Sequence, residues 1–337
     1  MQNLEQVKAL LSRPKRIVIT AHANPDGDAI GSALGLYHYL VKRGHSVTVI
    51  MPTQMPWYYN WLEGFNQIWV YYGAYSLSES LLEKAEVLFA LDYNTLSRVE
   101  QMADDLVATK AYKIMIDHHL YPDTTFVQAV LSDVSASSTA ELVYDFIGLL
   151  GGQESLSMAA MEAIFVGLLT DTGGFKYGTS PKFFRMITRL TERGVDSNRL
   201  NNLVFNAYSV KRFKLLAYSI NDCIEIMEEL NTGIIVLTKE DYKRLKIERG
   251  DTEGIVDSML KIRQLKVAAL IIERKNVVKI SMRSKGDFSV QEICTKYFGG
   301  GGHKNASGAL TKKEGLCETV AKLKNILTTA YKEQLQA

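Results

Sequence analysis

The chain has 337 residues, of which 47% are hydrophobic and 23% charged, and its formal net charge is +2. This composition is typical of a globular protein and excludes disordered and fibrous chains, and no apolar segment is long enough to span a membrane. The polar N-terminus lacks the apolar core of a signal peptide, and the three cysteines show neither metal-binding nor redox spacing, so we expect a protein of the reducing cytoplasm without membrane association.

Four short runs rich in Val and Ile alternate with helix-like segments in the first half of the chain. The runs occupy residues 16–20, 46–51, 86–92 and 113–117. Their polar and apolar residues hardly alternate, which is typical of strands buried on both faces. Helices are expected at 28–43, closed by Gly44, and at 139–150 and 158–170. This alternation predicts a mostly parallel, Rossmann-like α/β sheet.

The second half begins with a polar, helix-like stretch at 181–225 and then returns to an α/β pattern. A strand is expected at 232–238 and a hairpin at 266–285, turning near Lys275 and Asn276. A helix, the glycine run at 299–308 and an amphipathic helix near 316–335 follow. We therefore expect a catalytic domain at 1–190, a helical connector at 191–228 and a smaller α/β domain at 229–337.

Acidic residues and histidines gather where the predicted strands end. They are His22, Asp26 and Asp28 after the first run, Asp92 at the end of the third, Asp117, His118 and His119 after the fourth, and Asp171 after a later apolar run. Parallel strands end at one edge of a sheet, so these side chains would converge. Like charges about 4 Å apart repel by roughly 4 kcal/mol at an effective dielectric constant of about 20, so cations must lie among them.

Oxygen and imidazole ligands without thiolates favour octahedral divalent ions, most readily Mn²⁺, with Mg²⁺, Co²⁺ or Fe²⁺ as alternatives. Four aspartates and two histidines suffice for two ions that share one carboxylate. Two ions bridged by a hydroxide are suited to in-line attack on phosphorus.

Other interpretations of the segment around NPDGD fail or explain only part of it. An EF-hand that starts at Asn24 would have Ala29 where Gly is required and Gly35 where Glu is required. Gly27, Gly31 and Gly35 do not match a dinucleotide-binding fingerprint, and their spacing of four would line one helix face for close packing. Any single aspartate here, Asp28 included, could cap a helix.

Five segments together resemble the motifs of the DHH phosphoesterase superfamily. HANPDGDAIGS, ALDYN, IDHH and LLTDTGGF look like the four motifs of its catalytic domain, and GGGGHKNASG looks like the signature of its DHH-associated C-terminal domain. The resemblance implies that one metal ion is bound by His22, Asp26 and Asp92, and the other by Asp28, Asp92, His118 and Asp171. Asp92 would then be the bridge.

The same resemblance implies roles around the metals. His119 would face the scissile phosphate as a donor, and Asp117 would hold the imidazoles in orientation. Asn24, between two ligands, could touch substrate, although loop structure alone would explain it.

A run of four glycines leaves backbone N–H groups open to a phosphate, although a flexible turn is the simpler interpretation. The resemblance implies that this loop and an arginine on a preceding strand bind the nucleotide portion of the substrate. The candidates are Arg283, Gly301, Gly302 and His303, with Asn305 and Ser307 as weaker ones. Residues 1–195 carry 15 Lys and Arg against 20 Asp and Glu, and residues 196–337 carry 24 against 17, which favours an anionic ligand for the second half.

Within the superfamily, the chain resembles the oligoribonucleases that also act as 3′-phosphoadenosine 5′-phosphate phosphatases. We expect a metal-activated hydroxide to hydrolyse short RNA to mononucleotides and this nucleotide to AMP, with no binding of long duplexes. Linear or cyclic dinucleotides remain alternative substrates, and a nucleotide-sensing module without turnover is the alternative outside the enzymes. A family II pyrophosphatase would lack the glycine run, and a single-strand exonuclease would need a further domain. The aromatic stretch WYYNWLEGF at 57–65 is expected to pack or to form a lid.

Overall fold

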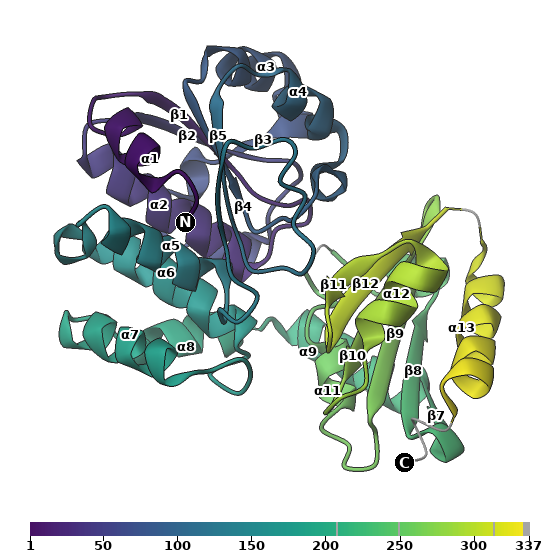
Figure 1. Ribbon diagram of the computed structural model, residues 1–337. Coiled ribbons are helices and arrows are strands. Elements are labelled where there is room, and N and C mark those ends of the chain that lie inside the picture. The colour runs from purple at the N-terminus through teal and green to yellow at the C-terminus, as the bar shows by residue number, and fades with distance from the viewer. Residues whose placement is uncertain (207, 249, 313, 333–337) are drawn as a thin grey trace. The chain divides into compact units, whose positions relative to one another are not determined.

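The computed structural model describes residues 1–206, 208–248, 250–312 and 314–332, and the chain divides into two compact units, Met1–Ala207 and Tyr208–Ala337 (Figure 1). This division lies inside the segment 191–228 predicted as a connector. The helix α8 (Ser197–Phe205) belongs to the first unit, and α9 (Val210–Asp222) belongs to the second. Among the described residues, no helix combines the length and apolarity needed to cross a membrane.

The first unit is built on a six-stranded sheet in the order β3-β2-β1-β4-β5-β6. Its strands are β1 (Arg16–Thr20), β2 (Ser46–Met51), β3 (Trp69–Val70), β4 (Val87–Leu91), β5 (Tyr112–Asp117) and β6 (Ala129–Ser132). Every neighbouring pair is parallel, which confirms the predicted sheet. The edge strands β3 and β6 were not predicted, because two and four residues give no periodic signal.

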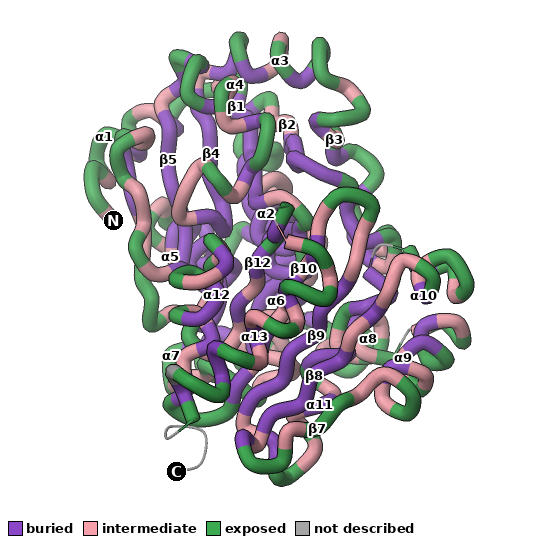
Figure 2. Tube along the Cα trace, turned by 90° about the vertical axis from the view of Figure 1, so that its right-hand side faces the viewer, coloured by how far each residue is buried: buried purple, intermediate pink, exposed green. Residues whose placement is uncertain are grey.

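The strand order reverses between β1 and β4, where one connection leads to β2 and β3 on one side and the next crosses to the other. In open α/β sheets, ligands bind at the carboxyl ends of the strands on either side of such a reversal. Figure 2 shows the strands of this sheet as largely buried. The strand order therefore favours a ligand site at the carboxyl ends of β1 and β4.

Helices cover this sheet on both sides. They are α1 (Leu4–Leu10), α2 (Gly27–Lys42), α3 (Tyr75–Lys84), α4 (Ala103–Ala108), α5 (Thr139–Leu149), α6 (Met158–Asp171), α7 (Pro181–Glu192) and α8. Short 3₁₀ helices lie at η1 (Trp57–Tyr59), η2 (Phe65–Gln67), η3 (Tyr71–Gly73), η4 (Leu96–Met102) and η5 (Gln153–Ser155). The predicted helices at 28–43, 139–150 and 158–170 correspond to α2, α5 and α6.

The glycines of α2 allow α6 to approach closely. A Cβ atom placed on Gly31 would lie 2.4 Å from the carbonyl oxygen of Ala163 in α6, and one on Gly35 would lie 2.6 Å from Ile164 Cγ1. These distances are far below van der Waals contact. The predicted role of the four-residue glycine spacing in close packing is thus confirmed.

The second unit is built on a mixed sheet in the order β11-β12-β10-β9-β8-β7. Its strands are β7 (Ile224–Met227), β8 (Thr232–Leu237), β9 (Val267–Arg274), β10 (Val277–Ser284), β11 (Gly301–His303) and β12 (Ala306–Thr311). Its helices are α9, η6 (Glu228–Leu230), α10 (Lys239–Arg244), α11 (Ile255–Met259), α12 (Val290–Phe298) and α13 (Leu316–Ala330). The β9–β10 hairpin turns at 275–276 as predicted. Of the C-terminal helix predicted near 316–335, residues 333–335 lie outside the described residues.

The glycine run is an edge hairpin, which corrects our expectation of an open loop. Gly301–His303 pairs antiparallel with β12. A Cβ on Gly300 would lie 2.1 Å from the carbonyl oxygen of Gly308, and Gly302 has φ +139°, so both positions need glycine. Here glycine permits close backbone approach within the sheet.

We expect Gly31→Ala to destabilise the first unit by about 1–3 kcal/mol, because α6 backbone atoms occupy the space of the new methyl group. Urea unfolding followed by circular dichroism would measure the loss. The matched control is Gly73→Ala, where an added Cβ meets no atom within 4 Å. Equal stability of the two variants would contradict close packing as the reason for glycine at position 31.

Candidate metal centre

The loop after β1 begins the site, and the start of α2 fixes it. Asp26 is the N-cap of α2, and its Oδ1 accepts hydrogen bonds from the backbone N–H groups of Asp28 (3.0 Å) and Ala29 (3.1 Å). The cap is therefore Asp26 and not Asp28. This carboxylate lies 3.8 Å from Nε2 of His22.

Asp92 lies between two histidines, directly after β4. Its Oδ2 is 3.4 Å from Nε2 of His22, and its Oδ1 is 3.7 Å from Nε2 of His118. The residue is 2% exposed and has φ +61°, a left-handed conformation that is uncommon outside glycine and best tolerated by Asn and Asp. One oxygen toward each histidine is the arrangement that a bridging carboxylate requires.

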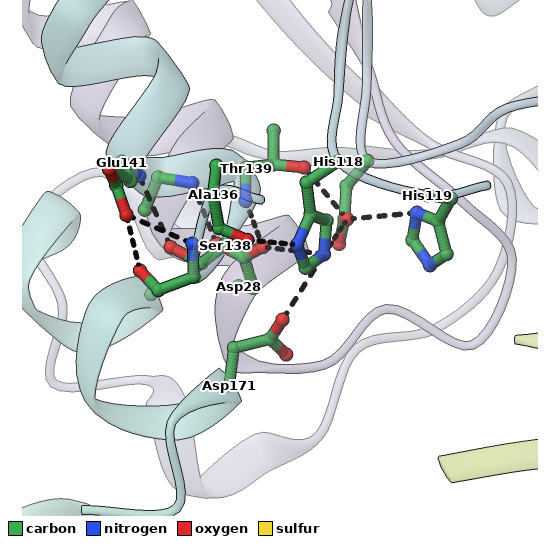
Figure 3. Close-up of polar contacts among 12 residues, drawn as sticks. Asp28, His118, His119, Ala136, Ser138, Thr139, Glu141 and Asp171 are labelled. Atoms are coloured by element: carbon green, nitrogen blue, oxygen red, sulfur yellow. Dashed lines mark hydrogen bonds and ion pairs between the residues drawn. The ribbon is translucent and has the colours of Figure 1, made fainter. Parts of the chain in front are cut away.

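His118 faces two further aspartates (Figure 3). Its Nε2 is 3.9 Å from Oδ2 of Asp28, near the start of α2, and 3.2 Å from Oδ2 of Asp171, the last residue of α6. Asp28 is fully buried. Residues from α2, from α6 and from the segment after β5 thus meet at one point.

Both histidines turn the same ring atom toward the acids. Nδ1 of His22 lies 2.8 Å from the carbonyl oxygen of Ala23, and Nδ1 of His118 lies 3.4 Å from that of Ala136. An Nδ1–H that donates to a carbonyl leaves the Nε2 lone pair for a metal ion. The rings are therefore oriented as metal ligands usually are.

The separations between these atoms fit divalent ions. Ligand atoms about 2.1 Å from an octahedral ion lie about 3.0 Å apart in cis and about 4.2 Å apart in trans. The contacts above, 3.2–3.9 Å, fall within this range. In the described part of the first unit, three groups have ligand atoms all within 4.8 Å of one another: His22, Asp26 and Asp92; Asp28, Asp92 and His118; and Asp92, Asp117 and His119. Among the described residues, Asp171 is in no such group and contacts the second one through His118.

The electrostatics of the site call for cations. Burial and the negative charges of Asp92 and Asp171 raise the pKa of Asp28 well above its usual range. Burial opposes protonation of His22, but its hydrogen bonds with Asp26 and Asp92 outweigh burial and raise its pKa to about 10. For His118, burial is likewise outweighed by Asp171, and its pKa rises to about 10. Protons thus compensate the crowded acids here, and divalent ions would displace them.

Asp117 orients one of the two neighbouring imidazoles. Its Oδ1 lies 2.7 Å from Nδ1 of His119, and its Oδ2 accepts the backbone N–H of His119 at 3.0 Å. Burial and the positive charge of Arg98 hold the pKa of His119 well below its usual range. A neutral ring that donates from Nδ1 presents a lone pair at Nε2, so the predicted donor role of His119 requires a second proton on the ring.

Arg98 is a residue of the site that our sequence analysis missed. It lies in η4, six positions after Asp92, and its carbonyl oxygen accepts the N–H of Ala23 at 2.7 Å. Its positive charge opposes protonation of His22 and His119. The sequence did contain a signal for it: an arginine shortly after Asp92, which ends a predicted strand. An anionic substrate bound at that strand end would need such a cation.

The loop residue Asn24 and the aromatic stretch lie beside this site. Asn24 has φ 57°, and its N–H donates to Oγ1 of Thr53 at 2.7 Å. In the aromatic stretch, Tyr59 and Phe65 are buried, which confirms packing, whereas Trp57 is 54% exposed. Contact of Asn24 with substrate and the lid both stay predictions.

In the second unit, Arg283 and His303 share one face of the sheet. Arg283 of β10 and His303 of β11 both pair with Ala306 of the intervening β12, and directly opposed residues point to the same side. The next row on this face includes Gly308 and Gly301, which have no side chains. Only the methyl group of Ala306 stands between the arginine and the histidine on this face. Nε of Arg283 donates to Oδ1 of Asp257 at 3.0 Å.

The two weaker candidates shape the glycine hairpin. Nδ2 of Asn305 donates to Oγ of Ser284 and to the carbonyl oxygen of Gly286, both at 2.9 Å. Oγ of Ser307 donates to the carbonyl oxygen of Gly301 at 2.6 Å. Substrate contact through these donors would compete with these hydrogen bonds.

Two family models match the chain. The DHH family, N-terminal domain, matches residues 16–168, and the DHHA1 domain matches residues 225–330. The chain is 31% identical over 298 residues to the bifunctional oligoribonuclease and PAP phosphatase NrnA of Thermus thermophilus. The aligned region covers 88% of this chain and 84% of that protein. The chain is also 26% identical over 318 residues to the cyclic-di-AMP phosphodiesterase GdpP of Geobacillus thermodenitrificans, covering 90% of this chain and 46% of that protein.

Solved structures share the fold. An exopolyphosphatase-related protein from Bacteroides fragilis has a TM-score of 0.92 and 35% identity, with 99% of this chain and 97% of that chain covered. RecJ from Thermus thermophilus, in complex with Mn²⁺, has a TM-score of 0.57 and 15% identity, with 97% of this chain and 55% of that chain covered. The second likeness shows the fold alone.

We expect Mn²⁺ to stabilise the metal-stripped protein, because it replaces repulsion among the buried carboxylates. Free Mn²⁺ at 100 times its Kd would add about 2.7 kcal/mol. At about 2–4 °C per kcal/mol, this raises the Tm of the first unit by about 5–10 °C. Differential scanning calorimetry with EDTA or with Mn²⁺ measures the difference.

The matched variants for this measurement are Asp92→Asn and Asp104→Asn. Asn tolerates the left-handed backbone of position 92, so that variant removes charge without adding strain. Asp104 is an exposed aspartate of α4 outside the cluster. Asp92→Asn should lose most of the shift and Asp104→Asn should keep it; an equal shift in both would contradict the metal centre.

Proposed function

The chain belongs to the DHH family of phosphoesterases and carries a DHHA1 domain, and from this premise we propose that it hydrolyses short oligoribonucleotides to mononucleotides and 3′-phosphoadenosine 5′-phosphate to AMP. The observation that carries the proposal is the position of Asp92 between two histidine and aspartate groups at the carboxyl edge of the sheet. The relative named as an oligoribonuclease and PAP phosphatase, similar over most of both chains, supports this substrate class.

In this proposal, His22, Asp26 and Asp92 hold one divalent ion, and Asp28, Asp92, His118 and Asp171 hold the other. The donor set of carboxylates and imidazoles favours Mn²⁺, with Mg²⁺, Co²⁺ or Fe²⁺ as alternatives. When bound, two such ions supply a hydroxide nucleophile near neutral pH and neutralise charge on the phosphoryl oxygens.

Arg98 and His119 would act on the substrate phosphate. The guanidinium of Arg98 supplies positive charge beside the ligands, where a phosphate oxygen needs it. Asp117 holds the ring of His119 through Nδ1 and directs Nε2 away from itself. To act as a donor, His119 would take a second proton from solvent when the phosphate binds; as a neutral ring, it offers Nε2 as an acceptor.

The second unit would bind the nucleotide portion. Arg283 and His303 stand on the same face of the sheet, and Gly301 and Gly302 keep the backbone accessible at its edge. The guanidinium of Arg283 suits a phosphate or a chain terminus. This assignment agrees with the basic excess of the second half of the chain.

A second candidate is hydrolysis of linear or cyclic dinucleotides. It is favoured by the similarity to the cyclic-di-AMP phosphodiesterase, of which the chain spans about half. Both candidates use the same metal centre, so only a substrate panel separates them.

We expect metal-stripped protein to be inactive and to regain turnover with Mn²⁺. The panel comprises a diribonucleotide, a pentaribonucleotide, 3′-phosphoadenosine 5′-phosphate, cyclic di-AMP and pyrophosphate, with products separated by ion-exchange chromatography. Asp92→Asn should lower kcat at least about 100-fold, and Asp104→Asn should not. Fastest turnover of cyclic di-AMP would favour the second candidate, and wild-type turnover by Asp92→Asn would exclude the bridging role.

We expect Arg283→Ala to raise KM for 3′-phosphoadenosine 5′-phosphate by about 10- to 100-fold, because a charged hydrogen bond contributes about 1.5–3 kcal/mol. The kcat should change much less, since Arg283 is not part of the metal centre. Steady-state kinetics measures both. Arg263→Ala, an exposed arginine of the same unit, is the control, and an unchanged KM in Arg283→Ala would contradict the assignment.

A further inference from the structure

The start of α5 touches the two aspartates of the second ligand group, and none of the roles above uses it. Thr139, the first residue of α5, donates its backbone N–H to Oδ2 of Asp28 at 2.7 Å. Ala140 donates its N–H to Oδ1 of Asp28 at 2.9 Å. The side-chain Oγ1 of Thr139 donates to Oδ1 of Asp92 at 2.9 Å. Figure 3 shows this helix start beside Asp28 and His118.

The hydroxyl of Thr139 acts on one particular oxygen. Oδ1 of Asp92 faces His118, whereas Oδ2 of the same carboxylate faces His22. A carboxylate can rotate about its Cβ–Cγ bond, and a hydrogen bond to one oxygen restricts that rotation. Thr139 thereby sets which oxygen is offered to the group that contains His118.

The turn that precedes Thr139 is itself fixed by hydrogen bonds and an ion pair. Oε2 of the buried Glu141 accepts hydrogen bonds from the N–H (2.9 Å) and the Oγ (2.8 Å) of Ser137, and its Oε1 pairs with Nζ of Lys182 at 3.1 Å. Ser138 caps the helix by accepting the N–H of Glu141 at 3.1 Å. The donor at position 139 is therefore held by four neighbouring contacts before any ligand arrives.

We propose that Thr139 is a positioning residue for the bridging carboxylate, and that its hydroxyl orients Asp92 toward the second metal ion. This inference rests on the proposed two-metal function. Mutation of a residue that hydrogen-bonds to a metal ligand typically lowers metal affinity by about 10- to 100-fold. Thr139 holds Oδ1, which faces His118, so removal of the hydroxyl should weaken binding of the ion in the His118 group more than binding of the ion in the His22 group.

The test is Mn²⁺ binding to metal-stripped protein by isothermal titration calorimetry, which needs no turnover. Thr139→Val keeps the shape and the backbone N–H but removes the hydroxyl, and Thr139→Ser keeps the hydroxyl. We expect Thr139→Val to weaken one of two Mn²⁺ sites by about 10- to 100-fold and Thr139→Ser to stay within about threefold of wild type. Tm values in EDTA verify that both variants fold.

A double variant distinguishes positioning from general damage. In His118→Ala the remaining site is that of the His22 group, and adding Thr139→Val should change its affinity much less than Thr139→Val changes the affinity of the His118 group. Equal loss in Thr139→Val and Thr139→Ser, or wild-type affinity of both sites in Thr139→Val, would overturn the positioning role alone. Binding of fewer than two Mn²⁺ by the wild type would overturn the proposed function, and the positioning role with it.

Discussion

The crowding of like charges at one edge of a buried sheet is the constraint on which this molecule depends. Asp28 and Asp92 are almost inaccessible to water, and each lies within 4 Å of the same histidine nitrogen. Burying several carboxylates without partners would cost more free energy than a domain of this size can spare. Protonated histidines can compensate this charge in part, and divalent ions can compensate it fully. The site therefore requires compensating positive charge, and this requirement supports the proposed metal centre.

The backbone of Asp92 adopts an uncommon conformation that places its carboxylate in the site. A left-handed residue directly after a central strand turns the chain sharply, and its N–H remains bonded to the carbonyl oxygen of Ile116 at 3.1 Å. Such a conformation costs of order 1–3 kcal/mol for a residue other than glycine. The surrounding sheet holds it in place, and the result is a carboxylate that lies between His22 and His118. A residue in ordinary extended backbone would continue the strand.

The convergence of most candidate site residues could be predicted from sequence, because the ends of buried parallel strands can be located from their apolar runs. Buried runs of Val and Ile locate β1, β4 and β5, and their parallel arrangement brings together residues as distant as His22 and His118. Contacts made by backbone N–H groups and by residues of ordinary type could not be predicted in this way. Thr139 and Arg98 carry no distinctive spacing, and the glycine run has the same letters in an open loop as in an edge hairpin. Local sequence indicates where a chain turns, whereas pairing with another strand, here β12, determines whether the segment is an open loop or an edge strand.

Gly167 of α6 lies at a helix crossing and beside the carboxylate of Asp28. A Cβ on this residue would lie 2.7 Å from Oδ1 of Asp28 and 2.5 Å from the Cβ of Ala140. Glycine here lets α6 approach α2 and α5 while the carboxylate of Asp28 stays against the start of α5. The glycines of α2 and α6 therefore allow close helix packing. They also set how near Asp171, at the end of α6, comes to His118. Because ligand distances must be right to a few tenths of an ångström, a methyl group at this helix crossing would disturb the proposed metal centre before it unfolded the domain.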